Sequence, residues 1–356
     1  MPLMYHRRRT IALCFLALAA AASSVNAQSA TPPATSDVPA IRRWLDVQSI
    51  HAASRFRWIE NSAERITASG IQWQTQQRGR FLFDRAGRYH VGAFATTGSS
   101  FVSSWNNTGA GIGTFARPFA LRHLYLSAEP IKGLEFQAGG LAINRGLLNE
   151  HVAYDSDSYM VGERVTVRPA RGPVPQISVT AGHFGDIRDT SVFNRFDTMS
   201  DVNYGQVVAN FRVGSRLTAS LDLTHEDGRD IIREGVHVRP PQGTKVLTLL
   251  KFEAYQRVDP DEAQGFNVGA DGAIGKLAIT AGVMHVDAAY GPYNGDRYET
   301  GTRYYSLLNY PLTSQLSLQL YHTRAFNIDF PIPLRHRLDV VAIFNPTAAL
   351  KRAGVF

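Results

Sequence analysis

The sequence of 356 residues is poor in cysteine and in long apolar runs. A single cysteine, Cys14, excludes a framework of disulfide bonds. With 19% charged residues and a mean hydropathy of −0.16, the chain lacks the repeated apolar runs of about 18 or more residues that a bundle of membrane helices needs. Apolar residues nevertheless make up 44% of the chain, which is too much for a mostly disordered protein. The composition therefore leaves a globular domain or a membrane β-barrel.

The first 27 residues have the layout of a secretory signal peptide. Three arginines at 7–9 form a basic start, and an apolar stretch follows over 11–22. Val25 and Ala27 then place small residues at the −3 and −1 positions of a cleavage site. We predict that residues 1–27 are cleaved and that the mature chain is exported.

Cleavage changes the charge that the working protein carries. It removes Cys14 and three of the 37 basic residues but none of the 30 acidic ones, so the net charge falls from +7 to +4. Such a modest charge on an exported protein does not predict a nucleic-acid partner. Residues 28–44 contain several prolines, serines and threonines, which predicts a flexible periplasmic lead-in.

From about residue 45 the dominant pattern is alternation between apolar and polar residues. The segments LTASLDLT (217–224), LEFQA (134–138) and LSLQLY (316–321) all repeat with a period of two, which is typical of strands with two different faces. No long stretch repeats at 3.6 residues, so helices should be scarce. We predict about 16 strands, with 14 or 18 as alternatives. They lie near residues 52–60, 70–83, 88–97, 119–128, 134–140, 160–168, 176–184, 204–213, 217–226, 231–239, 246–257, 265–271, 276–286, 303–310, 316–326 and 336–344.

The connections between these strands largely alternate between short turns and long loops. A meander of so many strands has two exposed edges unless it closes. Short turns at one end and long loops at the other are typical of bacterial outer-membrane barrels. We therefore predict that residues 45–344 form an all-β, transmembrane, up-and-down antiparallel barrel in the outer membrane. A soluble secreted β-protein is the alternative.

The sequence resembles the porin-like outer-membrane proteins of Gram-negative bacteria in its signal, its alternating strands, its connections and its terminal Phe356. A fainter similarity to the alginate-exporter type of barrel rests on RFRWIE (55–60) and on the many basic residues of the predicted lumen. GERVTVR (162–168) is similar to segments of uncharacterised barrels of that general kind. The resemblance implies a channel surrounded by outer-membrane lipid, with the barrel-assembly machinery as its partner during biogenesis. It implies no particular solute and leaves the oligomeric state open.

The end of the chain departs from the usual pattern of such barrels. They generally close on a strand that ends in an aromatic residue, whereas Asn345 and Pro346 interrupt the last alternating run. Either Phe344 ends the last strand and residues 345–356 form a tail, or this segment adds a closing strand of its own.

The alternation also predicts which side chains line the interior. In a membrane barrel the apolar set faces lipid, so the other set faces the lumen. This assignment sends nine cations and four carboxylates inward: Arg55, Arg57, Arg78, Arg80, Arg164, Arg168, Arg212, Lys251 and Arg337, with Glu135, Asp222, Glu253 and Asp339. An excess of cations in a water-filled passage concentrates anions and disfavours cations. We predict passive passage of small hydrophilic, anionic solutes. The alternative is a ladder of salt bridges that only hydrates or plugs a narrow barrel.

The loop that follows the fifth predicted strand lies where porin-like barrels commonly fold a loop inward. It contains Arg145, Glu150, Asp155 and Asp157, which we expect to form a constriction with a transverse field. A solvated surface loop is the alternative. The two aspartates could also reach one Ca²⁺ ion, but the rest of a calcium loop is missing, so we predict no metal site.

Two further functions compete with a channel. The chain has no Gly-x-Ser-x-Gly, no His-Glu-x-x-His and no metal-type spacing of Cys and His, so we predict neither an enzyme nor a cofactor. His225, Glu226 and Asp227 form the nearest thing to an acid–base group, as a barrel hydrolase would need. A non-conducting barrel that serves as an envelope scaffold or adhesin is the other alternative, and a small or filled barrel would favour it.

Overall fold

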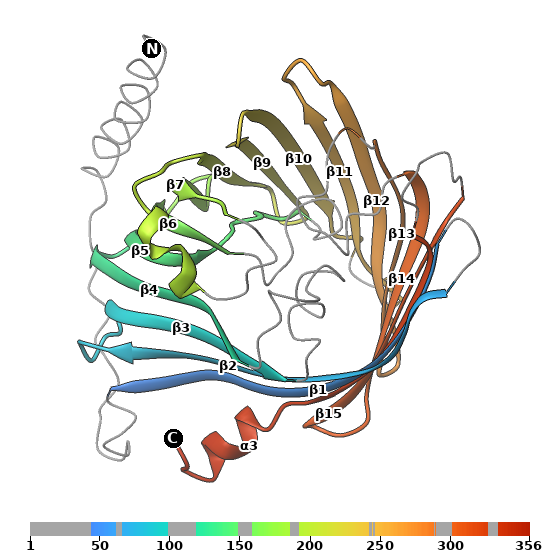
Figure 1. The fold of residues 1–356 in the computed structure, drawn as a ribbon, viewed down its shortest axis with the longest axis horizontal. Helices are drawn as coiled ribbons and strands as arrows, with labels where there is room; N and C mark the ends of the chain where they lie inside the picture. Colours follow the sequence, from blue (N-terminus) through green and yellow to red (C-terminus); the bar gives the residue numbers. More distant parts are fainter. Residues whose placement is uncertain are drawn as a thin grey trace.

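In the part of the chain that the structure describes, sixteen antiparallel strands close into one barrel (Figure 1). The structure is a computed structural model, and it describes residues 44–61, 66–98, 119–148, 159–185, 192–241, 244, 246–287, 289, 301–326 and 334–356. The strands are β1 (Leu45–Asn61), β2 (Ile66–Leu82), β3 (Tyr89–Gly98), β4 (Phe119–Ile131), β5 (Leu134–Ala142), β6 (Tyr159–Val167), β7 (Gln176–His183), β8 (Tyr204–Val213), β9 (Leu217–Glu226), β10 (Arg229–Val238), β11 (Leu247–Arg257), β12 (Ala263–Ile274), β13 (Leu277–Val286), β14 (Gly301–Pro311), β15 (Leu316–Ala325) and β16 (Leu334–Phe344).

Each strand pairs with its neighbours in sequence, and β1 pairs with β16 to close the ring. The prediction of an all-β, up-and-down antiparallel barrel of about 16 strands is therefore confirmed. The largest difference lies at the first strand, which begins at Leu45 and not near residue 52. A register shift between Val47 and Ser49 breaks the alternation there, since a bulge inserts an extra residue and reverses the parity of those that precede it.

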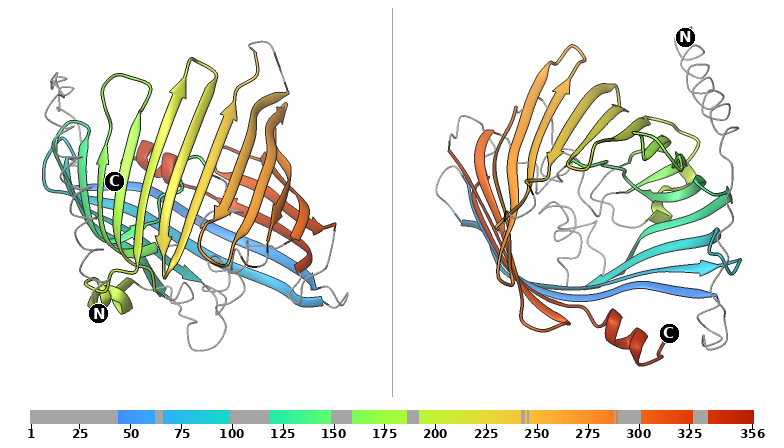
Figure 2. Two further views of the ribbon diagram at one scale, coloured as in Figure 1. Left: turned by 90° about the horizontal axis from the view of Figure 1, so that it is seen from above. Right: turned by 180° about the vertical axis from the view of Figure 1, so that it is seen from behind.

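The two ends of the barrel differ in their connections (Figure 2). At the end where β1 begins and β16 finishes, turns such as 132–133 and 275–276 are short. We call this the turn end. The opposite, loop end carries the long connections 99–118, 143–158, 184–203 and 287–300, together with one tight turn between β9 and β10. Asp227 and Gly228 form that turn with φ of 46° and 84°, as two-residue hairpin turns require.

The chain continues beyond β16 as a helix at the turn end, so residues 345–356 add no strand to the described barrel. Helix α3 (Thr347–Arg352) lies beside β1 (Figure 1). The hydroxyl of Thr347 accepts a hydrogen bond from the backbone N–H of Ile50 at 2.8 Å and donates one to its carbonyl at 3.3 Å. Among the residues described, none of the helices has the length and apolar character needed to cross a membrane. A 3₁₀ helix, η2 (Val192–Thr198), contacts β4, β5 and β6.

The barrel is apolar outside and polar inside. Ile71 and Leu126 are 71% and 58% exposed on the outer surface, while Gln72 and Gln74, of the opposite parity on β2, are buried. This is the reverse of a soluble globule and the pattern of a barrel surrounded by lipid.

Close contacts between tyrosine and glycine tighten the inner wall. The ring of Tyr125 on β4 lies over its cross-strand partner Gly92 on β3. A Cβ atom added at Gly92 would lie 2.5 Å from the Tyr125 hydroxyl oxygen and 2.6 Å from a ring carbon. A side chain larger than hydrogen at this position must therefore displace the ring.

Candidate functional site

A cavity of about 530 Å³ lies inside the barrel, between the segment that follows β5 and the wall formed by β1, β2, β11 and β13–β16. Among the described residues that line it, Arg55, Arg145, Lys251 and Arg337 are cationic. The acidic lining residues are Glu253 and Asp339.

The guanidinium groups of Arg55, Arg57 and Arg337 surround the carboxylate of Asp339. Arg57 donates from Nε at 2.9 Å to Oδ1 and from Nη2 at 3.0 Å to Oδ2. Arg337 donates to Oδ2 from Nε at 3.1 Å and from Nη2 at 2.7 Å, and Arg55 Nη1 lies 3.6 Å from the same oxygen. We call these four side chains the Asp339 cluster. They carry three positive charges and one negative charge.

The strand register produces this cluster. Arg57 is the direct partner of Asp339 across the β1–β16 seam, and two-residue spacing puts Arg55 and Arg337 on the same inward face. All four side chains are nearly buried, at 1–4% of their accessible surface. The side chain of Arg55 also donates to Gln72 Oε1 at 2.8 Å from Nε. Neutral and charged partners together hold these guanidinium groups against the wall.

Strand β11 contributes a cation and a carboxylate to the same cavity. Lys251 Nζ lies 2.7 Å from the carboxylate of Asp271 on β12. Glu253 accepts hydrogen bonds from the Tyr255 hydroxyl at 2.5 Å and from Asn267 Nδ2 at 3.0 Å. These contacts keep both charges in fixed positions on the lumen wall.

Other predicted lumen residues form ion pairs away from the cavity. Arg80 Nη2 lies 2.6 Å from the carboxylate of Asp46, and Arg168 Nη2 lies 2.7 Å from that of Glu135. Near the middle of the opposite wall, the fully buried Asp222 accepts from Arg233 Nη1 at 2.8 Å.

The remaining predicted residues contact neutral groups or solvent. The guanidinium of Arg78 lies 4.0 Å from the centre of the Phe94 ring, and Arg164 Nε donates to the Thr180 hydroxyl at 3.0 Å. Arg212 is exposed near the end of β8. The predicted lining residues thus have inward parity, but only Arg55, Lys251, Glu253, Arg337 and Asp339 come together at the cavity.

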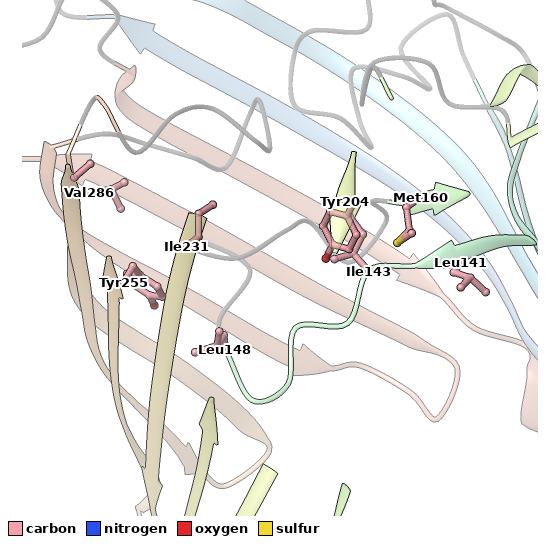
Figure 3. Close-up of a cluster of buried hydrophobic side chains, with 9 residues drawn as sticks. Leu141, Ile143, Leu148, Met160, Tyr204, Ile231, Tyr255 and Val286 are labelled. Carbon is pink, nitrogen blue, oxygen red and sulfur yellow. The ribbon is translucent and has the colours of Figure 1, made fainter. Parts of the chain in front are cut away.

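Residues 143–148, which we call the strap, run from β5 into the barrel interior (Figure 3). Ile143 and Leu148 belong to a buried apolar cluster inside the barrel. Gln206 Nε2 donates to the carbonyl of Asn144 at 2.7 Å, which ties the strap to β8. Arg145 extends to the cavity on the other side.

Gly146 is required at the point where the strap meets the wall. Its φ is +57°, and a Cβ atom there would overlap the Ser220 hydroxyl and lie 3.0 Å from Val208 Cγ1. An L-residue is strained in this conformation. Of the predicted constriction residues, Arg145 is thus located, whereas Glu150, Asp155 and Asp157 lie outside the described residues.

Sequence reasoning missed several inward side chains. Arg233 and Arg303 are almost completely buried, as is Tyr305, which also lines the cavity. The signal was weak because their strands alternate poorly. On β10 the inward set contains Ile231 and the outward set contains Glu234, so apolarity does not separate the two faces.

At the loop end, hydrogen bonds from Arg257 connect the turn between β11 and β12 with the segment that follows β13. Its Nε donates to Asp259 at 2.6 Å, its Nη2 to Asp261 at 2.9 Å, and its Nη1 to the carbonyl of Ala289 at 2.8 Å. The hydrogen bond from Arg257 lowers the pKa of the Asp259 carboxyl below its usual value, with help from the backbone N–H groups of Asp261 and Asp230.

The candidate acid–base residues His225, Glu226 and Asp227 do not lie together on one face of the barrel wall. His225 Nδ1 lies 2.6 Å from the carboxylate of Asp230, whereas Glu226, the next residue along the strand, is buried on the opposite face. Asp227 is exposed in the turn. Within the described ranges, no cluster of three or more His, Cys, Asp or Glu is arranged to hold a metal ion.

Comparison with known proteins identifies the architecture. No family model and no curated protein matches the chain. A solved structure of a five-substitution mutant of the Rh. blastica porin is similar with a TM-score of 0.55 and 11% identity, covering 83% of this chain and 99% of that one. Pseudomonas putida OprB, in a structure at high pH, is similar with a TM-score of 0.57 and 10% identity, covering 86% and 95%. The chain therefore has, over its described residues, the outer-membrane porin-like fold of sixteen strands.

Proposed function

We propose that the protein is an outer-membrane channel for the passive passage of small hydrophilic, anionic solutes. The observation that carries this proposal is the Asp339 cluster, in which the guanidinium groups of Arg55, Arg57 and Arg337 share one carboxylate beside the cavity. Four cations and two carboxylates are among the described residues that line the cavity, and a field of one sign in a space bounded by protein raises the local concentration of anions.

The size of the barrel supports a channel over a scaffold. Barrels of about eight strands are filled by their own side chains, whereas those of about sixteen leave an aqueous lumen. The described part of this chain contributes sixteen strands, and the strap leaves a cavity of about 530 Å³ beside it. The geometry around His225 offers no comparable support for a hydrolase.

Planar-bilayer recordings in a gradient of potassium chloride test the proposal. We expect discrete channel steps and a reversal potential that favours chloride. Arg55→Gln should lower the ratio of chloride to potassium permeability, because it removes one of the cations whose field favours anions in the lumen. The matched control is Arg324→Gln, since Arg324 is exposed and of outward parity on β15.

Each outcome of these recordings has a defined meaning. The absence of channel steps would overturn the channel itself. A preference for potassium would overturn the anionic selectivity and leave a channel. An equal effect of the two substitutions would show that the charge acts from the surface and not from the lumen.

Export to the outer membrane is part of the same proposal. Residues 1–27 serve as the cleaved signal peptide, 28–44 as the periplasmic lead-in and 345–356 as a tail at the periplasmic end. Protein isolated from the outer-membrane fraction should begin at Gln28, and N-terminal sequencing measures this directly. The presence of residues 1–27 on the protein in that fraction would contradict the proposed cleavage.

A further inference from the structure

The cavity wall carries an apolar segment among its polar and charged side chains. Leu307 on β14, Tyr321 on β15, and Val341 and Ile343 on β16 all line the cavity. We call these four side chains the apolar wall. Inward positions of a membrane barrel are normally polar because they face water. Contact with water therefore does not explain the aliphatic side chains at these positions.

The strap presents a second apolar surface to the same space. Leu147 and Leu148 line the cavity from the side of the strap. Leu148 also approaches Gly235 of β10, where an added Cβ would lie 3.0 Å from its Cδ2 atom. Apolar groups thus line the cavity from two sides, the apolar wall and the strap. On the side away from the cavity, the strap contacts β10 through Leu148.

The apolar wall adjoins the Asp339 cluster directly. Val341 is the cross-strand partner of Arg55, and Tyr321 is that of Asp339. Partners of this kind have Cβ atoms about 4.5–5.5 Å apart. The guanidinium of Arg337 lies 5.1 Å from the centre of the Tyr321 ring. Cationic and apolar groups therefore meet within the width of one small molecule.

We propose that this cavity is a binding station for amphiphilic carboxylates, in which an aromatic or alicyclic body is attached directly to the carboxylate. The inference rests on the proposed channel function and narrows its solute class. The body lies against the apolar wall and the strap, while the carboxylate lies in the field of the cations that line the cavity, Arg55, Arg145, Lys251 and Arg337. Guanidinium groups suit this role because their planar fork matches a carboxylate.

The same lining disfavours two simpler solutes. A small anion such as acetate would use the cations but leave Leu307, Val341 and Ile343 in contact with water. A sugar could form hydrogen bonds with polar lining residues such as Gln74, Gln76 and Gln319, but those of its hydroxyl groups that face the apolar wall would be buried without partners, which is costly. An apolar body joined to one negative charge uses both halves of the cavity.

Block of the chloride current by benzoate tests the proposal in the full-length mature protein at low ionic strength. Benzoate should interrupt the current at concentrations about tenfold lower than acetate, because its ring is removed from water against the apolar wall. Benzamide, which has the same ring without the charge, and glucose should not interrupt it. Equal block by acetate, or stronger block by benzamide or glucose, would overturn the inference while leaving the channel intact.

Substitutions in the apolar wall test whether benzoate binds there. The double variant Val341→Thr/Ile343→Thr keeps β-branched side chains but replaces a methyl group of Val341 by a hydroxyl and shortens Ile343. Benzoate block should weaken by about tenfold, the lower end of what one pocket methylene contributes. Val340→Thr is the matched control, because Val340 neighbours Val341 but is 39% exposed on the outer face.

The two proposals fail in different ways. Loss of benzoate block in the control as well as in the double variant would show that the apolar wall is not the site, and so would unchanged block in the double variant. Absence of channel steps in the unmodified protein would overturn the channel function and this inference together.

Discussion

Replacing the shared carboxylate of the Asp339 cluster should destabilise the barrel more than any exposed ion pair can. Asp339→Asn removes the negative charge and turns one acceptor into a donor that faces guanidinium groups. Arg57 and Arg337 donate four hydrogen bonds of 2.7–3.1 Å to this side chain, and it is only 4% exposed. Breaking a buried pair by removing one partner costs about 3–5 kcal/mol, so we expect a loss of that size.

Unfolding of the purified barrel by guanidinium chloride in detergent micelles measures the loss. Asp46→Asn is the control, because its pair with Arg80 is 28–34% exposed and should contribute less than about 1 kcal/mol. The Asp339 variant should also prefer chloride more strongly than the unmodified protein. Similar unfolding of the two variants would refute the reasoning. If Asp339→Asn does not assemble, a cycle with Arg57→Gln, which removes one of the three cations around residue 339, should restore part of the stability.

Three further substitutions test separate parts of the structure. Gly146→Ala should move the strap and change single-channel conductance, and unchanged conductance would contradict this. Gly92→Ala should cost about 1–3 kcal/mol of unfolding free energy by overpacking Tyr125, whereas Gly205→Ala, where nothing lies within 4 Å of the new Cβ, should not. Asp259→Asn should lower stability near neutral pH but not in acid. The lowered pKa of this carboxyl stabilises the fold above its unfolded value of about 3.9, and that contribution is lost as the pH falls through the folded pKa. A difference from the unmodified protein that persists in strong acid would contradict it.

Strands with clean alternation were predictable from the sequence because the period fixes both the strand and its faces. LTASLDLT (217–224) is such a case, and its inward Asp222 is fully buried in the structure. β10 was predictable only as a strand, since Glu234 faces outward and Ile231 inward. The bulge near Val47 hid the start of β1, because one extra residue exchanges the two faces.

The candidate site was less predictable than the fold because its contacts join distant parts of the chain. Alternation placed Arg55 and Asp339 on the inward face but carried no information that they share one cluster. The position of Arg145 in a long loop suggested a constriction. Its approach to the cavity depends on Gly146 meeting Ser220, a contact that no local pattern indicates. The apolar wall was hidden for a related reason, since inward aliphatic residues contradict the rule used to assign parity.

The seam between β1 and β16 joins the two ends of the chain's sheet. Arg57 and Asp339 meet across 282 positions of the chain, so their pairing carries a large loop-closure entropy. Without β16 (Leu334–Phe344), one edge of β1 has no strand beside it. Unpaired edge strands are prone to pair with other chains. The last strand carries the carboxylate that neutralises arginines of the first. Closure of the ring and neutralisation of these arginines by Asp339 therefore occur through the same strand pairing.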